Sequence, residues 1–194
     1  LSAEIHANSR RGRVKVEARV DNAVVCRGTL NSRWQRPVLD SPIDGTIDLS
    51  GADLASLAHL SSEIVRLIGQ IEGSLAISGT LREPEVEGAL RVTDAELKLA
   101  ADVPTIATIN GSLLIDGSQT AILDLAAEMG YAPVRITGPI SLVKGVPRLD
   151  LTITADNALM VQNRDLRVRI STTDLTLTGP LTALHSAGTI LIDS

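Results

Sequence analysis

Apolar and polar residues alternate along most of the chain with a period of two residues. In the stretch 71–81, IEGSLAISGTL, apolar residues or glycine occupy the odd positions, and polar or small residues occupy the even ones. The same pattern returns in 134–142 and in 175–181. Side chains alternate between the two faces of a β-strand, so each of these segments predicts a strand with one apolar and one polar face. The function then depends on what covers the apolar face.

Turn residues divide the alternating segments into a series of predicted strands. Asp116-Gly117 is a strong hairpin signal, and Lys144-Gly145 and Asp156-Asn157 also fit turns. The connections are too short for crossovers, which predicts an antiparallel, meandering sheet. A loop is expected over 32–42. The predicted strands are 13–20, 23–30, 43–49, 68–81, 85–93, 95–100, 106–115, 120–129, 132–143, 147–155, 159–170, 173–181 and 186–192.

One stretch departs from the two-residue period. Leu54, Leu57, Ile64, Leu67 and Ile68 recur at steps of three and four residues, which is helical spacing. We therefore predict a helical segment over 52–67, between N-terminal strands in 1–50 and a main meandering sheet in 68–192. Residues 1–194 together are expected to form one β-rich groove domain. The chain begins at Leu1 with a strand-like pattern, without an initiator Met or signal peptide, so we expect a fragment of a longer protein.

Glycines recur inside the predicted strands, mostly at apolar positions. A glycine within a strand often marks a bend or a close approach of backbones, so about one per strand predicts a strongly coiling sheet. The expected fold is an all-β, single, elongated and strongly curled antiparallel sheet, with a hydrophobic groove and one short helical segment. These glycines are Gly73, Gly79, Gly88, Gly111, Gly138, Gly179 and Gly188.

The apolar positions are almost entirely aliphatic. Hydrophobic residues make up 44% of the chain, yet it has one Trp, one Tyr and no Phe. Strands usually favour aromatic residues too, so the apolar face is predicted to be a smooth aliphatic wall. Two explanations fit this composition: a general bias of the chain toward aliphatic residues, or a surface that contacts flexible hydrocarbon chains. The net charge of −5 argues against a nucleic-acid partner, and no run approaches the length of a membrane-spanning helix.

The sequence lacks the motifs of enzyme chemistry. No phosphate loop, dinucleotide fingerprint or Gly-x-Ser-x-Gly elbow is present. His6, His59 and His185 lie far apart and have no neighbour at metal-ligand spacing, and the single Cys26 permits no internal disulfide. We therefore expect no enzymatic activity, no metal and no cofactor.

The apolar face could be covered in two ways. The sheet could close on itself as a sandwich or filled barrel, or it could curl partway and leave an aliphatic trough open. An exposed apolar patch beyond a few hundred Å² usually marks an interaction site, and hydrocarbon tails are natural occupants of an aliphatic one. The residues predicted to line the groove are Leu75, Ile77, Leu90, Val92, Leu113, Ile115, Leu123, Leu125, Ile136, Ile140, Leu151, Ile153, Val168, Ile170, Leu175 and Leu177.

Residues 73–97, GSLAISGTLREPEVEGALRVTDAEL, carry a resemblance to a known family. The ordered motif Gly79-Thr80-Leu81-x-x-Pro84-x-Val86-x-Gly88 resembles a phrase that is repeated in the C-terminal region of the TamB family. Residues 44–54, 109–118 and 175–181 look like neighbouring phrases of that region. The likeness covers about 43–192 well and the first 40 residues loosely.

This resemblance implies a fold, a location and a function. TamB-like proteins are long periplasmic proteins, anchored in the bacterial inner membrane, and they belong with the AsmA-like bridge-type lipid carriers. Their fold is a taco-like curled sheet with a hydrophobic groove. They pair with the outer-membrane barrel TamA and are linked to phospholipid movement and to outer-membrane protein and autotransporter assembly. The partners implied for this chain are phospholipid, a TamA-like barrel bound by the full-length protein, and outer-membrane protein clients.

Two other functions fit the same sequence pattern. A periplasmic chaperone could template nascent outer-membrane strands on an open sheet edge by β-augmentation. A closed structural β-solenoid spacer would instead have a filled interior and no ligand.

Overall fold

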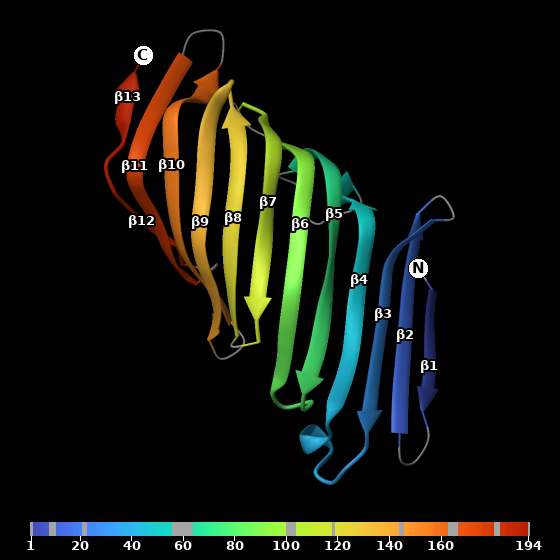
Figure 1. The fold of residues 1–194 in the computed structure, drawn as a ribbon. Coiled ribbons are helices and arrows are strands. Elements are labelled where there is room, and N and C mark those ends of the chain that lie inside the picture. Colours follow the sequence, from blue (N-terminus) through green and yellow to red (C-terminus); the bar gives the residue numbers. More distant parts are fainter. Residues whose placement is uncertain are drawn as a thin grey trace. The chain divides into compact units, whose positions relative to one another are not determined.

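The fold of this chain consists almost entirely of β-strands in the computed structural model (Figure 1). The structure describes residues 2–7, 11–20, 23–55, 64–99, 104–117, 119–143, 146–162, 167–180 and 183–193. The strands are β1 (Ser2–Ala7), β2 (Arg11–Val20), β3 (Ala23–Arg33), β4 (Ile43–Asp53), β5 (Ile64–Gly79), β6 (Pro84–Leu99), β7 (Ile106–Asp116), β8 (Thr120–Met129), β9 (Ala132–Val143), β10 (Val146–Gln162), β11 (Arg167–Pro180), β12 (His185–Ala187) and β13 (Leu191–Asp193). A single turn of 3-10 helix, η1 (Val38–Asp40), lies between β3 and β4.

The strands stand in the sheet in the order of the sequence. They run from β1 to β12, each beside its neighbour in the chain, and β13 pairs with β11 (Figure 1). The sheet is antiparallel and, within the described part of the chain, does not close on itself. The prediction of an all-β fold with one antiparallel sheet is therefore confirmed.

The chain divides into two compact units. Unit 1 comprises Leu1–Ala52, Ile71–Leu90 and Leu114–Gln119, and unit 2 comprises Asp53–Gln70, Arg91–Leu113 and Thr120–Ser194. The divisions fall inside strands β4 to β7, so each of these strands contributes one part to each unit. The single groove domain expected from the sequence stays a prediction.

In unit 1, β2, β3 and β4 carry a polar row across one face. Arg13 stands opposite Asn31, and Asn31 stands opposite Asp44. The Arg13 Nε donates a hydrogen bond to Asn31 Oδ1 (2.7 Å), and the Asn31 Nδ2 donates one to Asp44 Oδ2 (3.0 Å). The other face of β4 carries Ile43 and Ile47, which are buried and half-buried. The alternation in the sequence thus gives each strand its two unlike faces.

Several predicted strand boundaries are wrong. The strand predicted over 159–170 is divided between β10 and β11, β11 continues through the break predicted at 171–172, and the strand predicted over 186–192 is two strands, β12 and β13. Two further errors share one cause. The sequence predicted breaks at Asp94 and at Asp156-Asn157, yet β6 and β10 run straight through these positions. Asp94 and Asn157 have φ angles of 47° and 57°, and β10 shifts its register against β11 between Ala155 and Ala158. Asp and Asn tolerate the left-handed conformation in a β-bulge as readily as in a turn, so the same residues serve both.

The predicted helical segment is also wrong for most of the residues that the structure describes. Residues 52–53 lie in β4 and residues 64–67 in β5, whereas 54–55 have 3-10 helical backbone and 56–63 lie outside the described residues. Within β5, Val65 and Arg66 are both exposed, between the half-buried Ile64 and Leu67. Two successive exposed residues shift the alternation by one position, and this shift produces the three-residue step that looks helical in the sequence.

Few side chains in this fold are deeply buried. Eight hydrophobic residues among those described are buried, and four of them are alanines. A small cluster forms where Ala132, Ala155 and Ala158 pack together with Met129, Val134 and Ile170 at the edge of it. Most apolar side chains are only half-buried, which is the condition of one face of a sheet that lacks a second packed layer.

Candidate functional site

The candidate site is the apolar face of unit 2, where aliphatic side chains form rows across β8, β9, β10 and β11. One row joins Leu125 to Ile136, Ile136 to Ile153, and Ile153 to Leu175. Residues directly opposite each other on antiparallel strands project from the same face. Each of these side chains is half-buried. The row is thus a continuous aliphatic strip that remains partly open to solvent.

A second row lies two residues further along each strand, on the same face, and it contains a glycine. Leu123 stands opposite Gly138 on β9, and Leu151 stands opposite Leu177 on β11. A Cβ added to Gly138 would stand 2.2 Å from the carbonyl oxygen of Asp150 and 3.0 Å from the Cα of Leu151. Gly138 also has a φ of 144°, which side-chain-bearing residues rarely adopt. Glycine therefore permits β9 and β10 to approach closely at the centre of the apolar face.

The predicted groove residues fall on the less exposed positions of their strands in both units. Leu151 is buried with 6% exposure, and all the others are half-buried. Unit 1 holds Leu75, Ile77, Leu90 and Ile115. Unit 2 holds Val92, Leu113, Leu123, Leu125, Ile136, Ile140, Leu151, Ile153, Val168, Ile170, Leu175 and Leu177. Their role as a ligand-binding groove stays a prediction.

Sequence reasoning missed several residues of this face, because they are small. Ala121 stands opposite Ile140, and Ala127 stands opposite Val134, so both alanines belong to the apolar rows. Gly130 in the β8–β9 turn also packs closely on Leu159, whose Cβ lies 2.3 Å from where a Gly130 Cβ would stand. The signal was present in the period-two alternation, which places these alanines in phase with Leu123 and Leu125.

The reverse face of the same strands is polar. Asp124, Thr137, Thr152 and Thr176 stand opposite one another in a row across β8 to β11. Arg135 donates from Nε and Nη2 to the two carboxylate oxygens of Asp124, at 3.1 and 2.8 Å. Both side chains of this ion pair are about half exposed, so the pair contributes less than about 1 kcal/mol to stability. The row instead keeps this face hydrated.

A shallow hollow of about 360 Å³ lies on the polar face of unit 2. Of its lining residues, sequence reasoning singled out only Val92, as a groove residue, and Gly111, as a glycine within a strand. Asn110 at its edge supports the left-handed conformation of Asp94 in β6, because Asn110 Oδ1 accepts a hydrogen bond from the Asp94 backbone N–H (3.0 Å). Asn110 Nδ2 donates to the carbonyl of Thr108 (3.1 Å), so the amide is engaged in structure. The lining comprises Arg91, Val92, Thr93, Asn110, Gly111, Ser112, Asp124, Ala126 and Arg135.

Side chains that could bind a metal ion do not cluster in the described part of the chain. Those residues contain no group of three or more His, Cys, Asp and Glu side chains placed to hold a metal ion. Cys26 is a free thiol in β3 and is half-buried. No helix among the described residues is long and apolar enough to cross a membrane. The apolar face offers aliphatic contacts, and the polar face carries the Arg135–Asp124 ion pair.

Comparison with protein-family models, with curated proteins and with solved structures finds no match for this chain.

Proposed function

We propose that this chain is a segment of a TamB-like periplasmic bridge whose apolar face carries phospholipid acyl chains between the inner and outer membranes. In this proposal the sheet curls along its length into a taco-like groove, and the full-length protein is anchored in the inner membrane. It pairs with a TamA-like outer-membrane barrel and supports outer-membrane protein and autotransporter assembly. The chain itself performs no catalysis.

The observation that carries the proposal is the half-burial of the aliphatic rows on β8 to β11. A filled core would bury these side chains, whereas Leu125, Ile136, Ile153 and Leu175 all keep part of their surface exposed. Each methylene of a lipid placed on such a surface contributes roughly 0.8 kcal/mol. About a dozen methylenes would contribute roughly 10 kcal/mol before the cost of ordering the chain. The polar row on the reverse face keeps the loaded protein hydrated.

The aliphatic composition of the rows supports a mobile hydrocarbon ligand. The described part of the chain has no aromatic side chain in the rows formed by β8 to β11, and its only tyrosine, Tyr131, is 98% exposed in the β8–β9 turn. Aromatic rings would fix a preferred ligand geometry, whereas Leu, Ile and Val side chains offer non-directional contact. A surface of this kind suits chains that slide along it.

The first test is to identify what the purified protein carries. A photo-cross-linking residue replaces Leu113, which lies at a half-buried position on β7, and a matched one replaces Ile122, which is 48% exposed. Mass spectrometry of an organic extract and of the cross-linked protein is expected to find phospholipid joined at position 113 and none at 122. A clean extract and no adduct at 113, after mild purification without detergent, would overturn the proposal.

A second test addresses transport in cells. The substitution Leu113→Asp places a carboxylate on the apolar face and is expected to block lipid transport while the β-sheet signal in circular dichroism stays unchanged. Ile122→Asp is the matched control because its side chain is already exposed. Normal transport by a folded Leu113→Asp variant would show that the face is not a lipid path.

A second candidate function is templating of client strands, and one observation favours it. Among the described strands, β12 and β13 pair with β11 alone, so they form an edge of the sheet. Leu191 and Ile192 in β13 are 65% and 67% exposed. An edge of this kind can accept an extended peptide by β-augmentation. Cross-linking from Leu191 that captures polypeptide, with no lipid captured from position 113, would favour the chaperone. No ligand at either position would favour a structural spacer.

A further inference from the structure

One end of unit 1 carries an ordered loop with apolar side chains directed outward. This corner comprises residues 34–41, which include η1, together with the β5–β6 turn, residues 81–83. The exposed apolar side chains are Trp34 (40%), Val38 (53%), Leu39 (52%) and Leu81 (37%). Trp34 is the only tryptophan of the chain. Exposed apolar groups that gather at one place on a protein usually mark a contact surface.

The corner is fixed in place by hydrogen bonds. Ser41 is fully buried, and its Oγ accepts a hydrogen bond from the Gln35 N–H (2.9 Å). The carbonyl oxygens of Ser41 and Leu39 accept hydrogen bonds from the N–H groups of Leu81 (3.1 Å) and Arg82 (2.8 Å). The two loops are thus joined through their backbones. This anchorage holds the side chains of Val38 and Leu39 in solvent, although folding would otherwise favour their burial.

Trp34 lies at the end of the apolar face of unit 1. A Cβ added to Gly12 would stand 2.6 Å from Cζ2 of Trp34, so the indole lies directly over Gly12. Gly12 stands opposite Ser32, and Ser32 stands opposite Ile43, so the ring shares a face with the buried Ile43. The ring can pack against Gly12 because this residue has no side chain. One side of the indole is therefore packed, and the residue remains 40% exposed.

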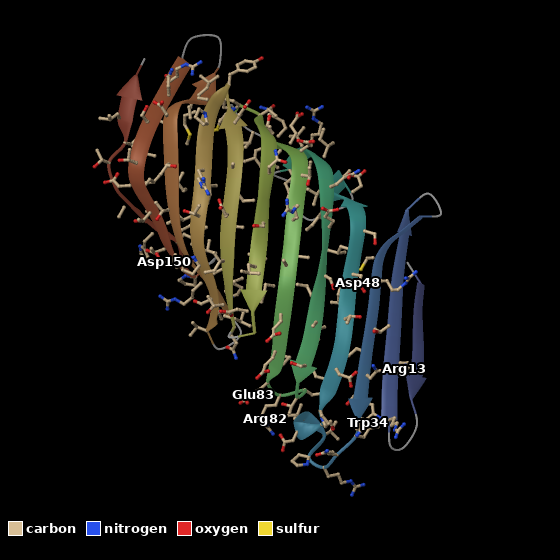
Figure 2. The ribbon with its side chains drawn as sticks, viewed as in Figure 1. Arg13, Trp34, Asp48, Arg82, Glu83 and Asp150 are labelled. Atoms are coloured by element: carbon tan, nitrogen blue, oxygen red, sulfur yellow. The ribbon has the colours of Figure 1, made fainter. Side chains whose placement is uncertain are left out.

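Arginines surround this apolar tip. Figure 2 shows Trp34, Arg82, Glu83 and Arg13 at the same end of unit 1. Arg11 and Arg33 are directly opposed on β2 and β3. The loop 34–41, the turn 81–83 and the adjoining strand ends contain four exposed arginines, Arg11, Arg33, Arg36 and Arg82, and two carboxylates, Asp40 and Glu83. The Arg82 Nε donates a hydrogen bond to Asp40 Oδ1 (2.9 Å), so these two charges form an ion pair. The tip is locally basic in a chain whose net charge is −5.

We propose that the corner docks on a membrane surface that contains anionic lipids, with Trp34, Val38 and Leu39 entering the headgroup region. Tryptophan is favoured at the interface of bilayers, because its ring is apolar and its N–H can hydrogen bond to water or headgroups. Apolar insertion and attraction of arginines to anionic headgroups act together in interfacial binding. This inference goes beyond the groove proposal and does not depend on it.

The single tryptophan makes the proposal directly measurable in the unmodified chain. The protein is mixed with vesicles of phosphatidylcholine alone, or of phosphatidylcholine with phosphatidylglycerol, and tryptophan emission and flotation are recorded. We expect flotation and a blue shift of Trp34 emission with the anionic vesicles only, and quenching when the lipid chains carry bromine. The binding is expected to weaken as salt concentration rises, because salt screens the arginines.

Matched variants separate the corner from the rest of the surface. Leu39→Ser is expected to weaken vesicle binding about tenfold, and Arg36→Gln about fivefold. The controls are Ile122→Ser and Arg148→Gln, which remove an exposed apolar side chain and an exposed charge from unit 2. Each control is expected to change binding less than about twofold. Circular dichroism of every variant verifies that the sheet has formed.

Several results would contradict docking of this corner on a membrane. Unchanged Trp34 emission with anionic vesicles would overturn the docking proposal, and so would equal losses in the corner variants and the controls. A blue shift caused by a soluble periplasmic protein and not by vesicles would assign the tip to a protein partner instead. The cross-link at position 113 reports separately on the groove, so failure of docking leaves the lipid-carrying proposal intact, and the reverse also holds.

Discussion

Gly138 on β9 and Leu151 on β10 are neighbours across the apolar face, and only a hydrogen atom of Gly138 fits between their backbones. A Cβ at position 138 would stand 3.0 Å from the Leu151 Cα and 2.2 Å from the Asp150 carbonyl oxygen. This contact is at the centre of the row that includes Leu123 and Leu177. The close approach of β9 to β10 at this row therefore depends on one residue.

Replacing Gly138 with alanine is expected to lower the free energy of unfolding by about 2–4 kcal/mol. The methyl group would overlap the backbone of β10, and the φ of 144° is strained for any residue with a side chain. Urea unfolding followed by circular dichroism measures the change. Gly28→Ala is the matched control, since its added Cβ would meet only ordinary contacts at 3.8 Å. Equal effects at both positions would contradict this account of Gly138.

The cost of truncating leucines is expected to differ between buried and half-buried positions. Leu151, which is 6% exposed, is expected to lose about 2–4 kcal/mol on substitution with alanine, through lost burial and a residual cavity. Leu123→Ala, in the same row, is expected to lose only about 1 kcal/mol, because part of its surface is already exposed. Urea unfolding of the two variants tests this. Similar large losses would indicate a filled core and would count against an open face.

A charge on the aliphatic rows is expected to remove bound lipid without unfolding the sheet. Leu125→Asp places a carboxylate beside Ile136, at the β8 end of the row, and we expect the lipid that co-purifies to fall about tenfold. Ile122→Asp, three residues earlier on the reverse face, is expected to retain its lipid. Quantitative mass spectrometry of organic extracts measures both. Equal lipid in the two variants would place the ligand elsewhere.

Asn157 is expected to tolerate glycine but not valine. Its φ of 57° suits Asn and Gly, whereas a β-branched residue pays about 1–2 kcal/mol in this conformation. The Asn157 N–H donates to Ser171 Oγ (2.8 Å), so the bulge is held to β11. Thermal unfolding of Asn157→Gly and Asn157→Val gives the comparison. If valine proved as stable as glycine, the left-handed conformation at 157 would be excluded.

The sheet was predictable from the sequence because period-two alternation is a local property. Burial alternates strictly between the two faces over 71–79 and over 132–136, and the structure has strands there. Strand ends were less predictable at Asp94 and Asn157, since an Asx residue in the left-handed conformation can end a strand or bend it. Which of the two occurs is decided by pairing with the neighbouring strand, and pairing is not local.

The corner of unit 1 could not be predicted for the same reason. Residues 32–42 were expected to form a loop, which is confirmed for 34–37, yet the sequence gives no sign that Leu39 and Ser41 bond to the backbone of 81–82. That contact joins segments about forty residues apart. In the sequence, Trp34 is notable only as the single tryptophan of a chain with few aromatic residues. The structure places its ring over Gly12. Local patterns predict faces, whereas tertiary contacts select which apolar groups stay exposed.

The sequential strand order has a consequence for how such a chain folds and evolves. Because each strand from β1 to β12 pairs with its neighbours in the chain, nearly every contact is closed by a short hairpin connection. Low contact order of this kind favours rapid, stepwise zippering of the sheet. A hairpin can also be duplicated or deleted without rerouting the remaining chain, as in repeat proteins. Gene duplication can thus adjust the span of the sheet one hairpin at a time while preserving both of its faces.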